Sequence, residues 1–105
     1  MPPSADLVSP ETLAVRGGIA TDSHHGAVIP PLHLSANFTF AGFGQKRAFD
    51  YTRSGNPTRA ELGSVLAQLE GGAQGIITSS GMAAVTLVLQ LLRPGDRIVV
   101  AHDCY

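Results

Sequence analysis

The sequence predicts an α/β protein in which an extended N-terminal arm is followed by the start of a mainly parallel sheet. Two continuous apolar runs, at residues 75–78 and 98–101, have the composition of strands that are covered on both faces. A helical pattern from Met82 to Leu92 lies between them, which indicates a strand, a helix and a strand joined by a right-handed crossover. The stretch from Ile19 to Asn56 has no sustained period, so we expect it to run extended over another surface.

Local signals mark where the helices begin and end. Ser9 and Pro10 predict a short helix that runs to about Arg16 and ends at the glycine pair that follows. Asn56 and Pro57 predict a second helix, with leucine and valine at helical spacing and a stop at the glycine pair 71–72. A turn is expected at residues 94–96. We therefore divide the chain into an arm, residues 1–55, that contacts a neighbouring subunit, and the beginning of a larger domain, residues 56–105.

The composition limits the classes of function. The 105 residues allow one small domain, and 44% apolar against 14% charged residues favours a folded chain over a disordered one. Seven basic and eight acidic residues give a net charge of -1, so nucleic acid is not an expected partner. A single cysteine, Cys104, excludes an internal disulfide, and no apolar run is long enough to span a membrane. We expect a cytoplasmic protein.

The segment between the first apolar run and the following helix is a candidate anion site. The amides of Ser80, Gly81 and Met82 are expected at a helix N-terminus, where unpaired N–H groups and the helix dipole favour a phosphate. The same residues fit equally well as a simple helix cap. Tyr51 and Arg53 lie on one side of an extended segment, where the guanidinium could bind a phosphate with two hydrogen bonds or remain a solvated surface charge.

The order of the motifs gives the chain a specific likeness. The motifs are Asp50–Arg59 (DYTRSGNPTR), Leu69–Gly72 (LEGG), Ser80–Met82 (SGM), Pro94–Asp96 (PGD) and His102–Tyr105 (HDCY). With residues 30–43, they resemble the Cys/Met-metabolism family of pyridoxal-phosphate (PLP) enzymes over nearly the whole chain from Leu13. The resemblance implies a fold-type-I PLP-dependent transferase-like fold, in which residues 56–105 begin the large PLP-binding domain.

The resemblance also implies roles for particular residues. The amides of Gly81 and Met82, beside Ser80, hold the cofactor phosphate. Tyr51 and Arg53 reach across a subunit interface to the phosphate of the neighbouring monomer. Tyr105 stacks on the pyridine ring and presents its phenol to the reacting atoms, which makes it the catalytic candidate.

Two further positions of the same motifs concern the substrate. The resemblance implies that Asp50 lies near the substrate. Ser54 stands where some relatives carry a second arginine for the acyl carboxylate, which weakens the inference of an O-succinyl substrate.

The implied reaction is a γ-replacement that joins an O-acyl-homoserine to cysteine and forms cystathionine in methionine biosynthesis. Cleavage of cystathionine at its β or γ position is the alternative within the family. The implied partners are small amino-acid substrates and further copies of the chain, as a homotetramer with active sites shared between subunits.

The chemistry also needs a lysine that attaches the cofactor, and this lysine is not identified here. Lys46, the only lysine, lies in a polar loop upstream of every cofactor motif and is not nominated. We therefore expect the 105 residues to be a fragment whose lysine lies beyond Tyr105. A non-catalytic fragment that binds a full-length subunit is the alternative from another class.

Overall fold

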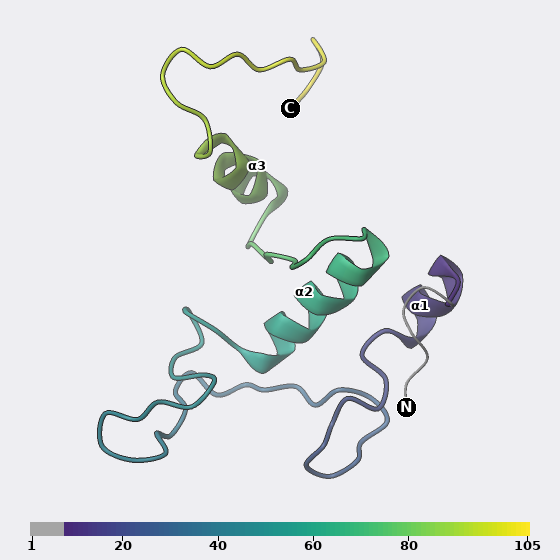
Figure 1. The fold of residues 1–105 in the computed structure, drawn as a ribbon, viewed down its shortest axis with the longest axis vertical. Coiled ribbons are helices and arrows are strands. Elements are labelled where there is room, and N and C mark those ends of the chain that lie inside the picture. The colour runs from purple at the N-terminus through teal and green to yellow at the C-terminus, as the bar shows by residue number, and fades with distance from the viewer. Residues whose placement is uncertain (1–7) are drawn as a thin grey trace.

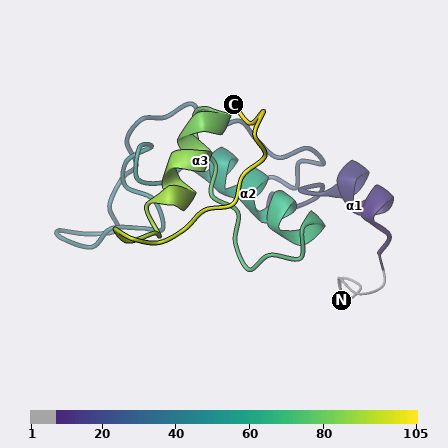
Figure 2. The same ribbon diagram turned by 90° about the horizontal axis from the view of Figure 1, so that it is seen from above.

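The computed structural model describes residues 8–105, and its helices in this range are α1 (Pro10–Arg16), α2 (Pro57–Leu69) and α3 (Gly81–Leu89). α1 packs beside α2, while α3 projects away from both, as Figure 1 shows. In this range no helix is long and apolar enough to cross a membrane. Between α1 and α2 the chain loops out well beyond the helices, which is visible in Figures 1 and 2.

The beginnings of all these helices are fixed by capping side chains, as the sequence predicts. The Ser9 hydroxyl accepts a hydrogen bond from the Thr12 amide at the start of α1. Asn56 Oδ1 accepts from the Thr58 amide at 2.9 Å at the start of α2. Each cap satisfies an amide that has no partner within the first helical turn.

Glycines end α1 and α2, which confirms the two predicted stops. The Gly17 amide donates to the Leu13 carbonyl at 2.7 Å, after which the chain leaves the helical path. Gly71 has φ +66°, and the Gly72 amide donates back to the Ala67 carbonyl at 2.7 Å. The left-handed conformation at Gly71 is one that glycine adopts without the steric cost of a Cβ.

The segment from residue 19 to residue 56 is irregular, as expected. Its β-bridges in the described chain are isolated antiparallel ones, between Asn37 and Tyr51 and between Gly42 and Gln45. The rings of Phe38 and Phe49 lie 5.8 Å apart beside the first bridge. The segment thus folds back on itself like a loose hairpin. Its contact with a neighbouring subunit remains a prediction.

The parallel sheet expected from the sequence is not formed within residues 8–105. Residues 75–78 and 98–101 run as coil without strand pairing, and Figure 1 shows them on opposite sides of α3. A strand exists only through hydrogen bonds to a neighbouring strand, and two strands alone do not make a stable sheet. Val99, at 99% exposure, therefore has no covering layer.

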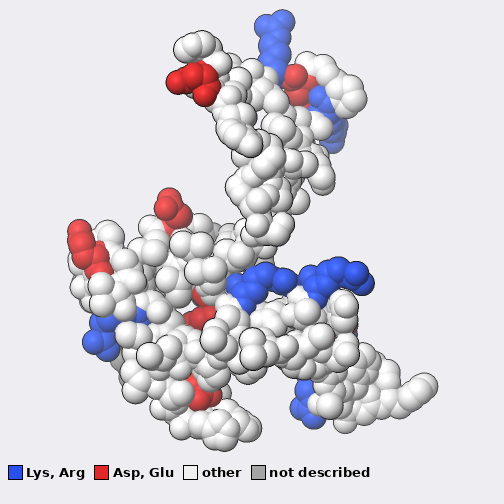
Figure 3. Space-filling view, turned by 180° about the vertical axis from the view of Figure 1, so that it is seen from behind, with Lys and Arg blue, Asp and Glu red and all other residues white. Residues whose placement is uncertain are grey.

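The chain has far more surface than a closed domain of its size. Its accessible surface is 9129 Å², whereas a compact 10.9 kDa monomer exposes about 5,600 Å². Its radius of gyration is 17.7 Å, against about 13 Å for a compact domain of this length. Figure 3 shows a narrow neck between two parts, with acidic and basic side chains interspersed on the visible face.

Two glycines bring the segment before α3 against α2. A Cβ on Gly63, in the middle of α2, would lie 2.5 Å from the carbonyl oxygen of Gly75. Because the obstacle is backbone on both sides, only glycine at these positions permits the contact. Gly63 is buried there, in a chain whose core is otherwise small. This contact fixes the path by which the chain leaves α2 and reaches α3.

Candidate functional site

The N-terminus of α3 has the geometry of an anion site. The Ser80 hydroxyl accepts from the Ala83 amide at 3.1 Å, and the Thr78 hydroxyl donates to the Ser80 carbonyl at 2.8 Å. Within the described residues the amides of Gly81 and Met82 have no hydrogen-bond partner. Apart from its chain neighbours and the backbone of its own helix, no described atom lies within 4 Å of the place where a Gly81 Cβ would stand, so a ligand can approach the backbone.

Tyr51 and Arg53 lie on a tight turn that follows the Asn37 bridge. The Tyr51 carbonyl accepts from the amides of Ser54 and Gly55 at 3.1 and 3.0 Å. The Thr52 amide donates to the Ala36 carbonyl at 2.8 Å, which ties the turn to the preceding strand-like segment. The Arg53 guanidinium carbon lies 5.1 Å from the centre of the Tyr51 ring, within the range of a cation–π contact.

The Asp50 carboxylate is held at the start of the same turn. It accepts hydrogen bonds from the Ser54 hydroxyl at 2.9 Å, the Tyr51 amide at 2.8 Å and Lys46 Nζ at 3.3 Å. These donors, with Ser54 as the largest contributor, lower the pKa of Asp50 below its ordinary 3.8. The side chain is 30% exposed and is ionised at neutral pH.

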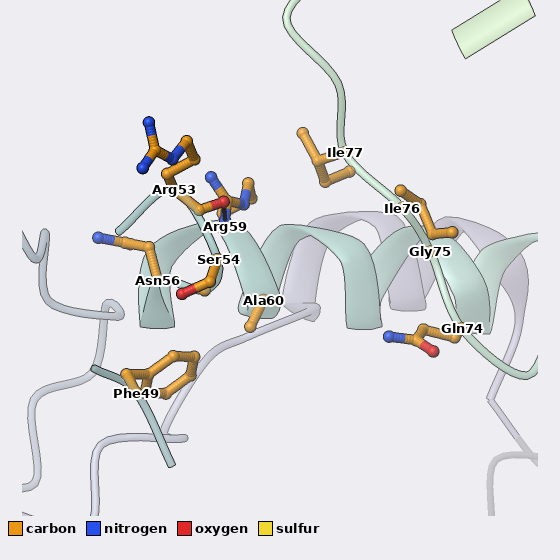
Figure 4. Close-up of a pocket in the computed structure, with 11 residues that line it drawn as sticks. Phe49, Arg53, Ser54, Asn56, Arg59, Ala60, Gln74, Gly75, Ile76 and Ile77 are labelled. Carbon is orange, nitrogen blue, oxygen red and sulfur yellow. Dashed lines mark hydrogen bonds between the residues drawn. The ribbon is translucent and has the colours of Figure 1, made fainter. Parts of the chain in front are cut away.

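A cavity of about 460 Å³ lies between this turn and the segment that precedes α3. Figure 4 shows the guanidinium groups of Arg53 and Arg59 together on one side of it, with Ile76 and Ile77 on another. The lining residues are Phe49, Arg53, Ser54, Gly55, Asn56, Arg59, Ala60, Gln74, Gly75, Ile76 and Ile77.

Arg59 is a site residue that sequence reasoning did not assign. Its Nη2 donates to the Arg53 carbonyl at 3.1 Å from the first turn of α2. The signal was available, because Arg59 closes the DYTRSGNPTR motif. Arg59 and Arg53 are six residues apart in the sequence, and this spacing alone does not indicate that the start of α2 brings them into contact.

Asn56 joins the arm to α2. It is 8% exposed, and its Nδ2 donates to the His33 carbonyl at 3.0 Å and to the Thr52 hydroxyl at 2.9 Å. The Thr58 hydroxyl accepts from the His33 amide at 2.9 Å and completes the joint. These hydrogen bonds therefore join the turn with Tyr51 to the start of α2.

The structure groups the site residues expected from the sequence into separate sets. Asp50, Tyr51 and Arg53 share one turn, and Ser80–Met82 form the start of α3. Tyr105, fully exposed, lies at the C-terminus on the far side of α3 from the turn (Figure 1). Within residues 8–105 the turn and the start of α3 therefore remain separate. In the described part of the chain no His, Cys, Asp and Glu side chains cluster as metal ligands.

Comparison with known proteins gives a consistent result. Residues 11–105 match the family described as Cys/Met metabolism PLP-dependent enzyme. The chain is 50% identical over 95 residues to cystathionine gamma-synthase of Escherichia coli K12, covering 90% of this chain and 25% of that protein. It is 43% identical over 99 residues to cystathionine beta-lyase of Lactococcus lactis subsp. cremoris, covering 94% of this chain and 26% of that protein.

Among solved structures, the chain resembles cystathionine gamma synthase from Xanthomonas oryzae pv. oryzae, which was crystallised with aminoacrylate and cysteine. The TM-score is 0.79 and the identity 61%, over 85% of this chain and 23% of that one. The chain thus spans about a quarter of the length of the relatives it matches. The likeness of fold to these PLP enzymes holds although the sheet is not formed in residues 8–105.

Proposed function

Since the chain belongs to the Cys/Met metabolism family of PLP-dependent enzymes, we propose that the full-length protein is a transferase that makes cystathionine. The reaction joins an O-acyl-homoserine to cysteine: the γ-carbon–oxygen bond breaks, a carbon–sulfur bond forms, and the acyl group leaves as a carboxylate. The observation that carries this choice is the 61% identity to a gamma synthase of known structure, against 43% to a beta-lyase.

The described residues fit the phosphate of PLP. The free amides of Gly81 and Met82 at the start of α3 supply donors where the helix dipole favours negative charge, and the open space at Gly81 admits the ligand. Arg53 supplies a planar cation suited to two hydrogen bonds with phosphate oxygens. When bound, PLP supplies the electron sink that stabilises negative charge on the substrate carbon.

We assign the remaining roles to this chain's own side chains. Tyr51 and Arg53 bind the phosphate from a neighbouring subunit, which is supported by the path of the chain in Figure 1, where the turn before α2 lies away from the N-terminus of α3. The exposed phenol of Tyr105 covers the cofactor ring and exchanges a proton with the reacting atoms. Asp50 lies at the edge of the same site and faces the substrate.

The shared site requires more than one copy of the chain. We propose a homotetramer in the cytoplasm, acting on small amino-acid substrates in methionine biosynthesis. The large exposed surface of the chain supports an assembly in which other segments or subunits cover it. Sedimentation of the full-length protein tests the assembly, and a monomer with bound cofactor would contradict the shared site.

The experiment that tests the reaction uses the purified full-length protein with PLP. Cysteine is supplied with O-succinyl- or O-acetyl-homoserine, and cystathionine is measured by mass spectrometry. We expect cystathionine to form with at least one donor. Absence of cystathionine with both donors would refute the proposal, whichever acyl group the enzyme prefers.

The comparison with a beta-lyase supports a second candidate, the cleavage of cystathionine. Incubation with cystathionine alone separates the cases: β-cleavage yields homocysteine, pyruvate and ammonia, while γ-cleavage yields cysteine, 2-oxobutyrate and ammonia. Release of a keto acid faster than the synthase reaction would make the protein a lyase.

The third candidate is a non-catalytic fragment that binds a full-length subunit. Lys46 is the only lysine in these residues, and its ammonium pairs with Asp50 at 3.3 Å. The intact mass of the natural protein decides this case. A mass equal to 10.9 kDa would favour the fragment, and a mass several times larger would favour the enzyme.

A further inference from the structure

The hydroxyl of Ser54 closes the turn that carries Tyr51 and Arg53. Its oxygen lies 2.9 Å from Asp50 Oδ1 and 2.8 Å from the Tyr51 carbonyl. A hydroxyl has one proton to donate, and an ionised carboxylate is the stronger acceptor. The proton is therefore directed to Asp50, so the two ends of the turn are held together by a charge-assisted hydrogen bond.

The same carboxylate holds two other groups. Asp50 Oδ1 also accepts from the Tyr51 amide at 2.8 Å, and Oδ2 accepts from Lys46 Nζ at 3.3 Å. A carboxylate has about four acceptor positions, so most of the capacity of Asp50 is directed to its own chain. We call the group formed by Lys46, Asp50, Ser54 and the Tyr51 amide the Asp50 clamp.

We propose that the Asp50 clamp positions Tyr51 and Arg53 as ligands of the PLP phosphate, with Asp50 and Ser54 as positioning residues. The inference rests on the proposed function, because it takes the phosphate as the ligand of this turn. Arg53 lies between Asp50 and Ser54 in the sequence, and its guanidinium carbon lies 5.1 Å from the centre of the Tyr51 ring. Opening the clamp releases both side chains from this joint arrangement.

Ser54 gains a role of its own from this geometry. A serine is short enough to reach both the carboxylate and the carbonyl of its own turn, whereas an arginine at this position would extend away from them. The identity of residue 54 therefore affects how firmly the phosphate ligands are held, apart from any contact with an acyl group.

The test measures cofactor binding to the full-length apoenzyme. PLP and pyridoxal, which lacks the phosphate, are titrated separately and followed by absorbance of the bound form. We expect Asp50→Asn and Ser54→Ala each to weaken PLP binding by about tenfold and to leave pyridoxal binding unchanged. Ser54→Thr, which keeps the hydroxyl, should restore wild-type affinity for PLP.

The control for carboxylate loss in general is Asp22→Asn. Asp22 accepts from the amides of His24 and Ala27 at 2.9 and 3.0 Å in a turn that carries no phosphate ligand. We expect this variant to bind PLP as the wild type does. Equal weakening by Asp22→Asn and Asp50→Asn would overturn the inference, because it would show a general effect on folding of the arm.

A reference variant, Arg53→Met, separates the inference from the function on which it rests. If Arg53→Met loses phosphate-dependent binding while Asp50→Asn and Ser54→Ala do not, the clamp is refuted and the phosphate role of Arg53 stands. If no variant, Arg53→Met included, changes PLP binding, the positioning role of the clamp and the phosphate role of Arg53 are both refuted. A raised KM for the acyl-homoserine in Asp50→Asn is expected from its place beside the substrate; if PLP binding of this variant is unchanged, the positioning role is overturned and only the substrate role stands.

Discussion

Replacement of Gly63 by alanine tests the backbone contact that directs the chain from α2 to α3. The new Cβ would lie 2.5 Å from the Gly75 carbonyl oxygen. Carbon–oxygen contacts in proteins are normally about 3.3–3.6 Å. The helix and the facing segment must therefore separate by about 1 Å.

Two effects of opposite sign decide how Gly63→Ala changes the free energy of unfolding. Overpacking of this kind costs about 1–3 kcal/mol, and the upper end applies because a backbone carbonyl cannot rotate away like a side chain. Alanine in place of glycine within a helix returns about 1 kcal/mol. We expect a net loss of about 2 kcal/mol in the free energy of unfolding.

The assay is urea unfolding of the full-length protein at fixed protein and PLP concentrations, since binding and assembly both shift apparent stability. Ser64→Ala is the matched control, because it alters the adjacent, exposed position of α2 and should be nearly neutral. A Gly63→Ala protein that equals or exceeds the wild type in stability would refute the reasoning, because helix propensity alone would then decide the outcome.

Three further results are expected. Asn56→Ala should cost about 2 kcal/mol in the same urea assay, because it removes the α2 cap and leaves buried partners unsatisfied. Asn56→Asp keeps the cap but puts a carboxylate oxygen where the amide donates to the His33 carbonyl, so it should not restore wild-type stability. Because the pKa of Asp50 is lowered in the folded state, its contribution is complete above its ordinary 3.8 and is lost as pH falls through the lowered value, so urea midpoints of wild type and Asp50→Asn should converge at acid pH. A constant difference down to strongly acid pH would contradict this. Arg59→Met should weaken PLP binding about threefold, because it removes the hydrogen bond to the Arg53 carbonyl, and Arg59→Lys should be intermediate. Unchanged PLP titrations of Arg59→Met would show that Arg59 does not support Arg53.

The parts of the fold that the sequence predicts are those determined by neighbours along the chain. Ser9 and Asn56 cap their helices through amides two or three residues away, so their role is readable from the order of residues. The sequence predicts the third helix from Met82 to Leu92, whereas α3 runs from Gly81 to Leu89. Its end differs because its stop lacks a left-handed glycine: Gln90 closes it in a helical conformation.

The sheet could not be predicted in the same way. The apolar composition of residues 75–78 and 98–101 describes what surrounds a strand, and the surrounding elements are absent from residues 8–105. The Gly63 contact was also missed, although an isolated glycine within a helix commonly has a packing reason. Its partner, Gly75, comes close only because the chain reverses at Gly71.

In the candidate site too, the local features can be predicted from the sequence and the contacts that depend on folding cannot. The amides of Gly81 and Met82 were predicted because a helix N-terminus is a local feature. The contact between Ser54 and Asp50, and that between Arg59 and Arg53, depend on the folded turn and were not predicted. The family resemblance supplied the names of the phosphate ligands, while the structure supplied the groups that hold them.

The length of α2 has a consequence for how proteins of this kind can diverge. Its 13 residues span about 20 Å, with the Asn56 joint at one end and the Gly63 contact in the middle. Inserting one residue between Asn56 and Gly63 would rotate the rest of the helix by about 100° and turn Gly63 away from Gly75. The exposed glycine turns at Gly26 and Gly44 have open space around them. Insertions and deletions should therefore collect in those turns, and α2 should keep its length.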